Sequence, residues 1–359
     1  MGRCQYRVRN CESVKETAVN NSQSIKQLRE RILRGGRVGA ALALVISLFG
    51  GFWSAAVPAQ AFPVKPIRLI VPYPPGGATD IVGRTYAQQL SQGLGQQVLV
   101  ENRPGAGATI GTLAAAKSPG DGYTVLLGTL SNLACAPSLY PNVGYDPIKS
   151  FAPVGRLTNS LFVIVVHPAL PIKSLRELIG LAKSRPAELT YGSAGSGTLL
   201  HIAGEMFKTA AGVNIIHVPY KGGGVAVIDL LAGRIQIIFD QLPTYQPHVQ
   251  AGKLKVLAVA GPNRLSQLPD VPTTGEAGMP GFQIVSWFGL VAPTGTPNDA
   301  IRRLNAEVLK ASETKELKDV LSARGADAAG SSPEELAALI ADGVSMCSRV
   351  IRTAGIKLD

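Results

Sequence analysis

Residues 189–206 read Leu-Thr-Tyr-Gly-Ser-Ala-Gly-Ser-Gly-Thr-Leu-Leu-His-Ile-Ala-Gly-Glu-Met. The apolar run Leu189–Tyr191 predicts a short buried strand, and the glycines that follow predict a tight turn. Beyond the turn, apolar residues recur at i, i+3, i+4 and i+7 from Leu199 to Met206, which places them on one face of a helix. A strand that enters a helix through a glycine-rich turn is a building unit of α/β folds.

The same alternation of apolar runs and helical stretches continues along the chain. Val82, Tyr86 and Leu90, for example, fall at i, i+4 and i+8, a helical spacing. The apolar runs are short and bounded by Gly, Pro, Asn or Asp, as expected of buried parallel strands. We therefore expect an α/β protein with mainly parallel sheets flanked by helices. The expected strands are Ile67–Val71, Val98–Val100, Tyr123–Leu127, Leu161–Val166, Leu189–Tyr191, Ile215–Val218, Ile235–Phe239, Val256–Ala260 and Val285–Val291.

Three helix starts are marked by side-chain chemistry. Ser174-Leu175-Arg176-Glu177 and Ser332-Pro333-Glu334-Glu335 have the pattern of capping boxes, in which Ser and Glu satisfy backbone N–H groups reciprocally. Thr296-Pro297-Asn298-Asp299 offers a Thr N-cap followed by Pro. Each motif predicts a helix that begins one residue after its Ser or Thr.

Composition and charge exclude several classes of protein. The 359 residues are 46% hydrophobic and 16% charged, with four Cys and with 40 Gly and 25 Pro at no fixed period, which excludes a disordered tail protein, a disulfide scaffold and a coiled coil. The formal charge is +11, but without residues 1–61 it falls to +5, from 26 basic and 21 acidic residues. No Lys/Arg block accompanies this surplus, so we expect no nucleic-acid partner.

The N-terminal segment resembles an export signal. Four arginines precede the apolar stretch Val38–Phe52, and Ala59-Gln60-Ala61 follows it, the order of a secretory signal peptide with cleavage after Ala61. The alternative is an uncleaved anchor helix, which needs about 20 apolar residues. The polar stretch before Arg29 is long for a signal, so either the signal is extended or translation begins later. We expect residues 1–61 to be removed and the protein to be exported to the periplasm.

Export removes Cys4 and Cys11 and leaves Cys135 and Cys347 in an oxidising compartment. These two cysteines either pair or remain buried as small apolar residues. The four histidines lie far apart in sequence and in no H-x-x-x-H pattern, so no metal site is predicted.

Two apolar segments, Leu161–His167 and Val285–Pro293, read as plain strands that are not paired with a helix. Each would serve as a crossover between two lobes. If both are hinges, lobe 1 comprises residues 62–163 and 288–359, and lobe 2 comprises residues 164–287. A mature chain of about 300 residues is long enough for two such domains. A ligand cleft then lies between the lobes.

Two glycine-rich turns are candidates for anion binding, because each joins a strand to a helix N-terminus. The first is Val71–Asp80, where Pro74-Pro75-Gly76-Gly77 precedes a helix expected to begin near Thr79 or Asp80; the alternative is an ordinary loop capped by Thr79 or Asp80. The second is the Tyr191–Thr198 turn already quoted. It lacks the G-K-[ST] ending of a nucleotide-binding loop and the G-x-S-x-G of a hydrolase nucleophile.

Further candidates have weaker signals. Lys221, in Pro219–Gly224, is the cation beside these turns and could close on a ligand carboxylate or simply be solvated. The Gly105–Gly111 stretch misses the dinucleotide spacing by one residue, so no dinucleotide and no other cofactor is expected. His201 and Glu205 lie at i, i+4 but have no activated nucleophile near them in sequence, and Asp240 could accept a hydrogen bond from a ligand amine or hydroxyl or cap the next segment.

Together, several of these segments resemble the Bug (TctC-like) family. The resemblance runs in order from Phe62 to Asp359, and the co-occurrence of its segments is more specific than any one of them. They are Pro72–Gly77 with Asp80, Asn102–Gly107, Asp121–Thr124, Tyr191–Ser193 with Gly195, Gly197, Thr198, His201 and Glu205, His217–Gly222, and Leu230–Gly233.

The resemblance implies a two-lobed periplasmic-binding-protein fold (type II-like) that closes on a small carboxylate and delivers it to the membrane permease of a tripartite tricarboxylate transporter. It also implies that backbone amides and hydroxyls of Pro75–Thr79 and Ala194–Thr198 hold the carboxylate. Gln241, where the family commonly has Asn, leaves the ligand's identity open among tricarboxylates, dicarboxylates, amino acids and aromatic acids. The ligand-binding residues expected are Tyr73, Pro75, Gly76, Gly77, Ala78, Thr79, Asp80, Thr129, Ala194, Gly195, Ser196, Gly197, Thr198, His201, Tyr220, Lys221 and Asp240.

The sequence thus favours an exported, monomeric carboxylate-binding protein without catalysis. Two alternatives stay open at this point. One is a sensor module that signals to a membrane receptor, and the other is a secreted hydrolase or isomerase that uses His201, Glu205 or Asp240.

Overall fold

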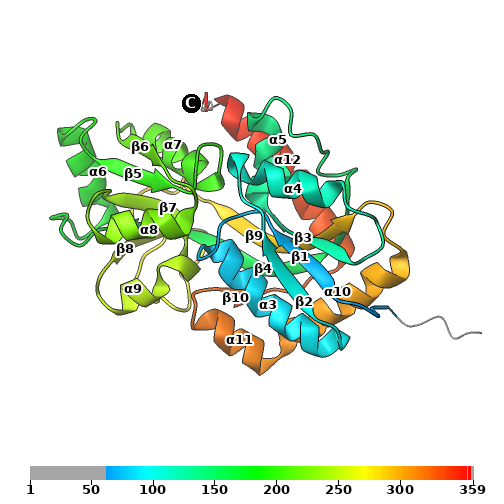
Figure 1. The fold of residues 1–359 in the computed structure, drawn as a ribbon. Coiled ribbons are helices and arrows are strands. Elements are labelled where there is room, and N and C mark those ends of the chain that lie inside the picture. The colour runs from blue at the N-terminus through cyan, green and yellow to red at the C-terminus, as the bar shows by residue number, and fades with distance from the viewer. Residues whose placement is uncertain (1–61, 354, 357–359) are drawn as a thin grey trace, which may run out of the picture. The chain divides into compact units, whose positions relative to one another are not determined.

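The computed structural model describes residues 62–353, 355 and 356; the expected signal peptide and its cleavage site lie outside these residues. In the described part, hydrogen-bonded strands follow the order β2-β1-β3-β9-β4-β7-β5-β6, and β8 and β10 both pair with β4 (Figure 1). The strands are β1 Ile67–Val71, β2 Val98–Asn102, β3 Thr124–Thr129, β4 Phe151–Val166, β5 Thr190–Ser193, β6 Ile216–Pro219, β7 Ile237–Gln241, β8 Lys255–Ala260, β9 Val285–Pro293 and β10 Asp327–Ala328.

The long strand β4 belongs to two sheets. Residues 151–161 pair with β9, and residues 162–166 pair with β7 and β8. We call the first sheet, with β1, β2, β3, β9, β10 and the start of β4, sheet A. The second sheet, with β5 to β8 and the end of β4, is sheet B. Each sheet with its helices is called a lobe; the lobe boundaries expected at residues 163/164 and 287/288 stay a prediction.

Helices cover both faces of each sheet. In sheet A, α3, α10 and α11 enclose one apolar cluster, and α12 packs on the opposite face. In sheet B, α8 packs on one face and α7 on the other. None of the helices in the described residues combines the length and apolar character needed to cross a membrane. The α-helices are α3 Ala78–Leu94, α4 Thr109–Ala116, α5 Ala136–Leu139, α6 Leu175–Ser184, α7 Leu199–Ala211, α8 Gly223–Leu231, α9 Gln246–Gln250, α10 Asn298–Glu313, α11 Lys315–Ser322 and α12 Pro333–Thr353.

Burial on both faces explains the continuous apolar runs in the sequence. In β4, Val163 and Val165 pack with the α8 side, whereas Ile164 and Val166 pack with the α7 side. Each of the four is at most 1% exposed. Because successive side chains point to opposite faces, a strand covered on both sides has to be apolar at every position.

The expected α/β class is confirmed, but the expectation of parallel strands is only partly confirmed. β1 runs parallel to β2 and β3, and β5 runs parallel to β6 and β7. The predictions of parallel strands at Leu161–Val166, Val256–Ala260 and Val285–Val291 are wrong, because β4, β8 and β9 pair antiparallel. Apolar runs report burial and carry no information about direction.

The start of β4 was also not predicted. The strand begins at Phe151, ten residues before the expected Leu161. Pro153 and Gly155 lie in this part, and its register against β9 shifts twice. Such bulges interrupt the two-residue alternation from which strands are recognised.

Two of the three predicted helix caps are confirmed. The Ser174 hydroxyl accepts from Glu177 N at 3.2 Å, and Ser332 and Glu335 form a reciprocal capping box at 3.2 and 2.9 Å. The third is wrong: Thr296 donates its hydroxyl to Pro293 O at 2.7 Å instead, and α10 begins at Asn298 after Pro297 without a side-chain cap.

Cys135 and Cys347 form a disulfide, which settles the question that the sequence left open. Cys135 ends η2 (Leu130–Cys135), a single π-helical turn that follows β3, and Cys347 lies in α12. Both residues are buried. The bond therefore ties the segment after β3 to a helix more than 200 residues later in the chain.

We predict that replacing both cysteines with Ala lowers the free energy of unfolding by about 2–5 kcal/mol, because the disulfide restricts the unfolded chain. Urea unfolding measures the change. Reductant should bring the wild-type protein to the stability of the double variant and leave that variant unchanged. Wild-type stability that is insensitive to complete reduction would contradict the prediction.

Candidate functional site

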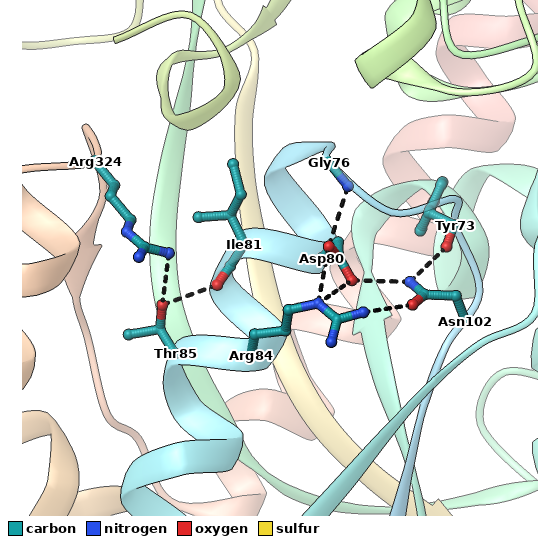
Figure 2. A network of polar contacts seen from close by, with 8 residues as sticks. All are labelled: Tyr73, Gly76, Asp80, Ile81, Arg84, Thr85, Asn102 and Arg324. Carbon is teal, nitrogen blue, oxygen red and sulfur yellow. Dashed lines mark hydrogen bonds and ion pairs between the residues drawn. The ribbon is translucent and has the colours of Figure 1, made fainter. Parts of the chain in front are cut away.

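The first glycine-rich turn, between β1 and α3, is held in place by Asp80 (Figure 2). The Asp80 carboxylate accepts from Gly76 N at 3.0 Å, from Asn102 Nδ2 at 2.9 Å and from Arg84 Nε at 2.9 Å. Asn102 also donates to Tyr73 O at 3.0 Å. Burial by itself raises the pKa of Asp80, but the hydrogen bonds from Arg84, Asn102 and Gly76 hold it below its ordinary value. Asp80 is thus an ionised carboxylate that stabilises the conformation of the turn through these hydrogen bonds.

The helix that follows this turn begins without a side-chain cap. α3 starts at Ala78, and Gly77 occupies the N-cap position with no side-chain hydrogen bond. The alternative, in which Thr79 or Asp80 is the N-cap of the helix, is therefore wrong, because Gly77 occupies that position. The first N–H groups of a helix have no intrahelical partner, so the start of α3 offers main-chain donors.

The second turn, between β5 and α7, is braced mainly by its own contacts. Gly195 N donates to the Ser193 hydroxyl at 3.1 Å, and Gly197 N donates to His201 Nδ1 at 3.3 Å. Thr198 donates from its N and its hydroxyl to Gly195 O. Several amides of the turn are thus already bonded within it.

The amide that directly follows the second turn bonds to the other lobe. Leu199 N, the first N–H of α7, donates to the Ser131 hydroxyl of η2 at 3.1 Å. Nearby, the Tyr140 hydroxyl donates to Ser196 O at 2.8 Å. Two side chains that follow β3 of sheet A therefore bond directly to the turn that follows β5 of sheet B.

The third turn, between β6 and α8, also approaches the first lobe closely. Gly222 has φ +122°, and a Cβ atom at this position would lie 2.6 Å from Pro74 Cγ. Only glycine combines this backbone angle with so close an approach. As a result, the start of α8 at Gly223 comes next to the start of α3.

The starts of α3, α7 and α8 meet at one cavity, which we call the inner cavity. Its volume is about 40 Å³, space for a few atoms or water molecules. Among the described residues that line it, none is Lys, Arg or His, and Asp240 is the acid. The lining residues are Tyr73, Pro74, Gly77, Ala78, Thr79, Thr129, Ser131, Ala194, Thr198, Leu199, Leu200, Gly223, Asp240, Gln241, Ser286 and Phe288.

Asp240 enters the inner cavity from the end of β7. It is 3% exposed, and its carboxyl accepts from Gln241 N at 2.7 Å and from the Tyr245 hydroxyl at 3.0 Å. Burial raises the pKa of Asp240 to about 7, although both hydrogen bonds oppose the rise. This carboxyl therefore changes charge near neutral pH.

A larger outer cavity, of about 500 Å³, shares Tyr73, Pro74, Ala194 and Thr198 with the inner one. Lys221 is the cation among its described lining residues. Tyr220 also lines it, and the Tyr220 hydroxyl donates to Asp229 at 2.7 Å. The remaining lining residues are Pro72, Pro104, Gly105, Ala106, Gly107, Ala108, Tyr140, Gly195 and Ser196.

Most of the expected ligand-binding residues come together at these cavities. The inner cavity collects Tyr73, Gly77, Ala78, Thr79, Thr129, Ala194, Thr198 and Asp240, and the outer cavity adds Gly195, Ser196, Tyr220 and Lys221. Pro75, Gly76, Asp80, Gly197 and His201 line neither cavity.

His201 and Glu205 are engaged beneath the second turn. His201 accepts the Gly197 N–H, and its ring stacks on His217 at 4.3 Å. Glu205 accepts from the Tyr191 hydroxyl at 2.7 Å and pairs with Lys208 at 3.0 Å. These contacts make the two residues supports of the turn.

Other lining residues were not predicted from the sequence. Ser286 and Phe288 alternate on one face of β9, a pattern that is visible in the sequence but does not reveal that this face lines a cavity. Ser131 lies in a π-helical turn, and Tyr140 follows a four-residue helix, so neither has a sequence signal.

Comparison with known proteins identifies the family. Residues 82–356 match the model of the tripartite tricarboxylate transporter family receptor (TctC), and the chain belongs to this family. It is 38% identical to the protein BugT of Bordetella pertussis over 306 residues, 85% of this chain and 94% of that protein.

Two solved structures are similar along most of the chain. Rpa4515 of R. palustris, solved with adipate, is 36% identical with a TM-score of 0.80, over 82% of this chain and 99% of that one. MatC of Rhodopseudomonas palustris, solved with bound malate, is 33% identical with a TM-score of 0.76, over 81% of this chain and 100% of that one. The predicted family and two-lobed binding-protein fold are confirmed, and the protein is a solute-binding receptor, not an enzyme.

The raised pKa of Asp240 predicts a pH-dependent stability. Its pKa of about 7 in the folded protein exceeds its ordinary value of 3.8, so its contribution is fully present below pH 4 and is lost as the pH rises through 7. The predicted loss is up to about 4 kcal/mol. The burial of Tyr73 and Tyr245, the ionisable neighbours, raises their pKa above the ordinary value of 10, so neither titrates in this range.

Urea unfolding of the wild type and of Asp240→Asn, each without ligand from pH 4 to 8, isolates this contribution, because other groups cancel in the difference between the two proteins. The wild-type advantage should fall steadily with rising pH. A difference that stays constant across the range would show that the Asp240 pKa is not raised.

Proposed function

We propose that the protein is a periplasmic receptor that binds a small organic carboxylate between its lobes and delivers it to the permease of a tripartite tricarboxylate transporter. The observation that carries the proposal is the meeting of three helix N-termini at a cavity that no described cation lines. Each helix N-terminus presents N–H donors and about half a positive charge, which favours an anion.

In this proposal the ligand carboxylate sits in the inner cavity, and the rest of the molecule extends into the outer cavity. The amides near Ala78, Thr79 and Gly223 and the nearby hydroxyls are the proposed donors. Hydrogen bonds to a charged group contribute about 1.5–3 kcal/mol each, and micromolar affinity requires about 8 kcal/mol. A few such bonds are therefore sufficient after ordering costs. The adipate and malate bound by related proteins support a carboxylate as the ligand.

The bonds of Ser131 and Tyr140 to the second turn support closure around the ligand. Both connect a segment after β3 to the turn before α7, so they form only when the lobes are close. A ligand that bridges the same turns then favours the closed form, which the permease would recognise.

The test of this function is a thermal-shift screen of the purified protein against a library of carboxylic acids. At a concentration 100 times its Kd, a bound acid stabilises the folded protein by about 2.7 kcal/mol and raises Tm without being consumed. Failure of every acid to raise Tm, or enzymatic turnover of a bound acid, would overturn the proposal.

The proposed closure also predicts an effect of Ser131 on ligand affinity. Ser131→Ala removes the acceptor for Leu199 N and should weaken ligand binding by about twofold to twelvefold, since a hydrogen bond contributes about 0.5–1.5 kcal/mol. Isothermal titration calorimetry with a ligand from the screen measures this change.

The matched control is Ser174→Ala. Its hydroxyl also accepts an N–H at a helix start, at 3.2 Å from Glu177 N, but within a single lobe. This variant should lose stability and keep the wild-type affinity. Equal affinities of the two variants would mean that the Ser131 bond does not support closure.

A further inference from the structure

Asp240 is an acidic group in a cavity that is otherwise suited to an anion. The inner cavity is lined by the starts of α3, α7 and α8 and by Asp240, which lies near the end of β7. A carboxylate ligand in this space meets the carboxyl of Asp240 at short range. Two adjacent carboxylates repel each other unless a proton or a donor lies between them.

The Asp240 carboxyl retains capacity to accept hydrogen bonds. A carboxylate has about four acceptor positions, and the two donors described here, Gln241 N and the Tyr245 hydroxyl, each use one oxygen. Gly223, at the start of α8, lies beside Oδ2, since a Cβ at this position would be 3.4 Å from this oxygen. No described Lys, Arg or His lines the cavity, so no cation there pairs with Asp240.

Resting on the proposed function, we infer that Asp240 determines specificity by accepting a hydrogen bond from a donor on the ligand carbon next to the bound carboxylate. The ligands selected are 2-hydroxy or 2-amino carboxylic acids, because the small inner cavity places the donor within one or two bonds of the carboxylate. An unsubstituted acid leaves the buried Asp240 acceptor without this donor, which carries a free-energy cost.

The experiment compares acids that share a carbon skeleton and differ only at carbon 2. Succinate, malate and aspartate form one triplet, and glutarate, 2-hydroxyglutarate and glutamate form another. Isothermal titration calorimetry at pH 8 gives the affinity of each acid. The wild type should bind the hydroxy or the amino acid at least about tenfold more tightly than the unsubstituted acid.

Variants of Asp240 separate the two donors. Asp240→Asn keeps an acceptor oxygen but loses the charge, so it should lower the preference for the ammonium group more than that for the hydroxyl. Asp240→Ala should remove both preferences. Thermal unfolding of each variant establishes that it is folded.

The control is Asp80→Asn, the same substitution at a carboxylate that braces the first turn and lines neither cavity. It should weaken the binding of all members of a triplet alike and leave their ratio unchanged. A purely structural role of Asp240 would produce this same uniform loss.

The outcomes for the inference and for the proposed function are distinct. Equal wild-type affinities within each triplet, a preference for the unsubstituted acid, or unchanged ratios in folded Asp240→Ala would overturn the inference and leave carboxylate binding intact. Absence of binding by every acid of the triplets and of the wider library would overturn both.

Discussion

The N–H groups at the starts of α3, α7 and α8, which lack partners within their own helices, are the constraint on which the site depends. These groups need acceptors, and the fold brings three sets of them to the inner cavity, which no described Lys, Arg or His lines. A main-chain anion site of this kind has its donors set by backbone position. The positions of the donors therefore depend on the conformations of the turns that precede those helices.

This dependence explains why strongly polar residues lie behind the turns. Asp80 is tied to Gly76, Arg84 and Asn102, and His201 accepts the Gly197 N–H. Both residues belong to the motifs that mark the family in this sequence, yet neither lines a cavity. Their contribution is to turn conformation, which is consistent with a receptor that binds without catalysis.

The segment after β3 links the site to the rest of the sheet-A lobe. Thr129 caps η2 by accepting from Ser131 N and Asn132 N, Ser131 accepts from Leu199 N across the cleft, and Cys135 anchors the end of η2 to α12. The π-helical turn thus places an acceptor for the opposite lobe on a covalently anchored support. Insertions of this type are rare and are frequent at functional sites.

The sequence by itself determined the α/β class, two of the three proposed helix caps and the glycine-rich turns that form the cavities, because each depends on local spacing, capping chemistry or backbone freedom. It did not determine the antiparallel course of β4 and β9 or the disulfide, since both depend on which distant segments meet. Only the tertiary structure separated Asp80 and His201, which brace turns, from Asp240, which faces the inner cavity. The physical reason is that a polar side chain's role is set by the partners that surround it, and those partners come from other parts of the chain.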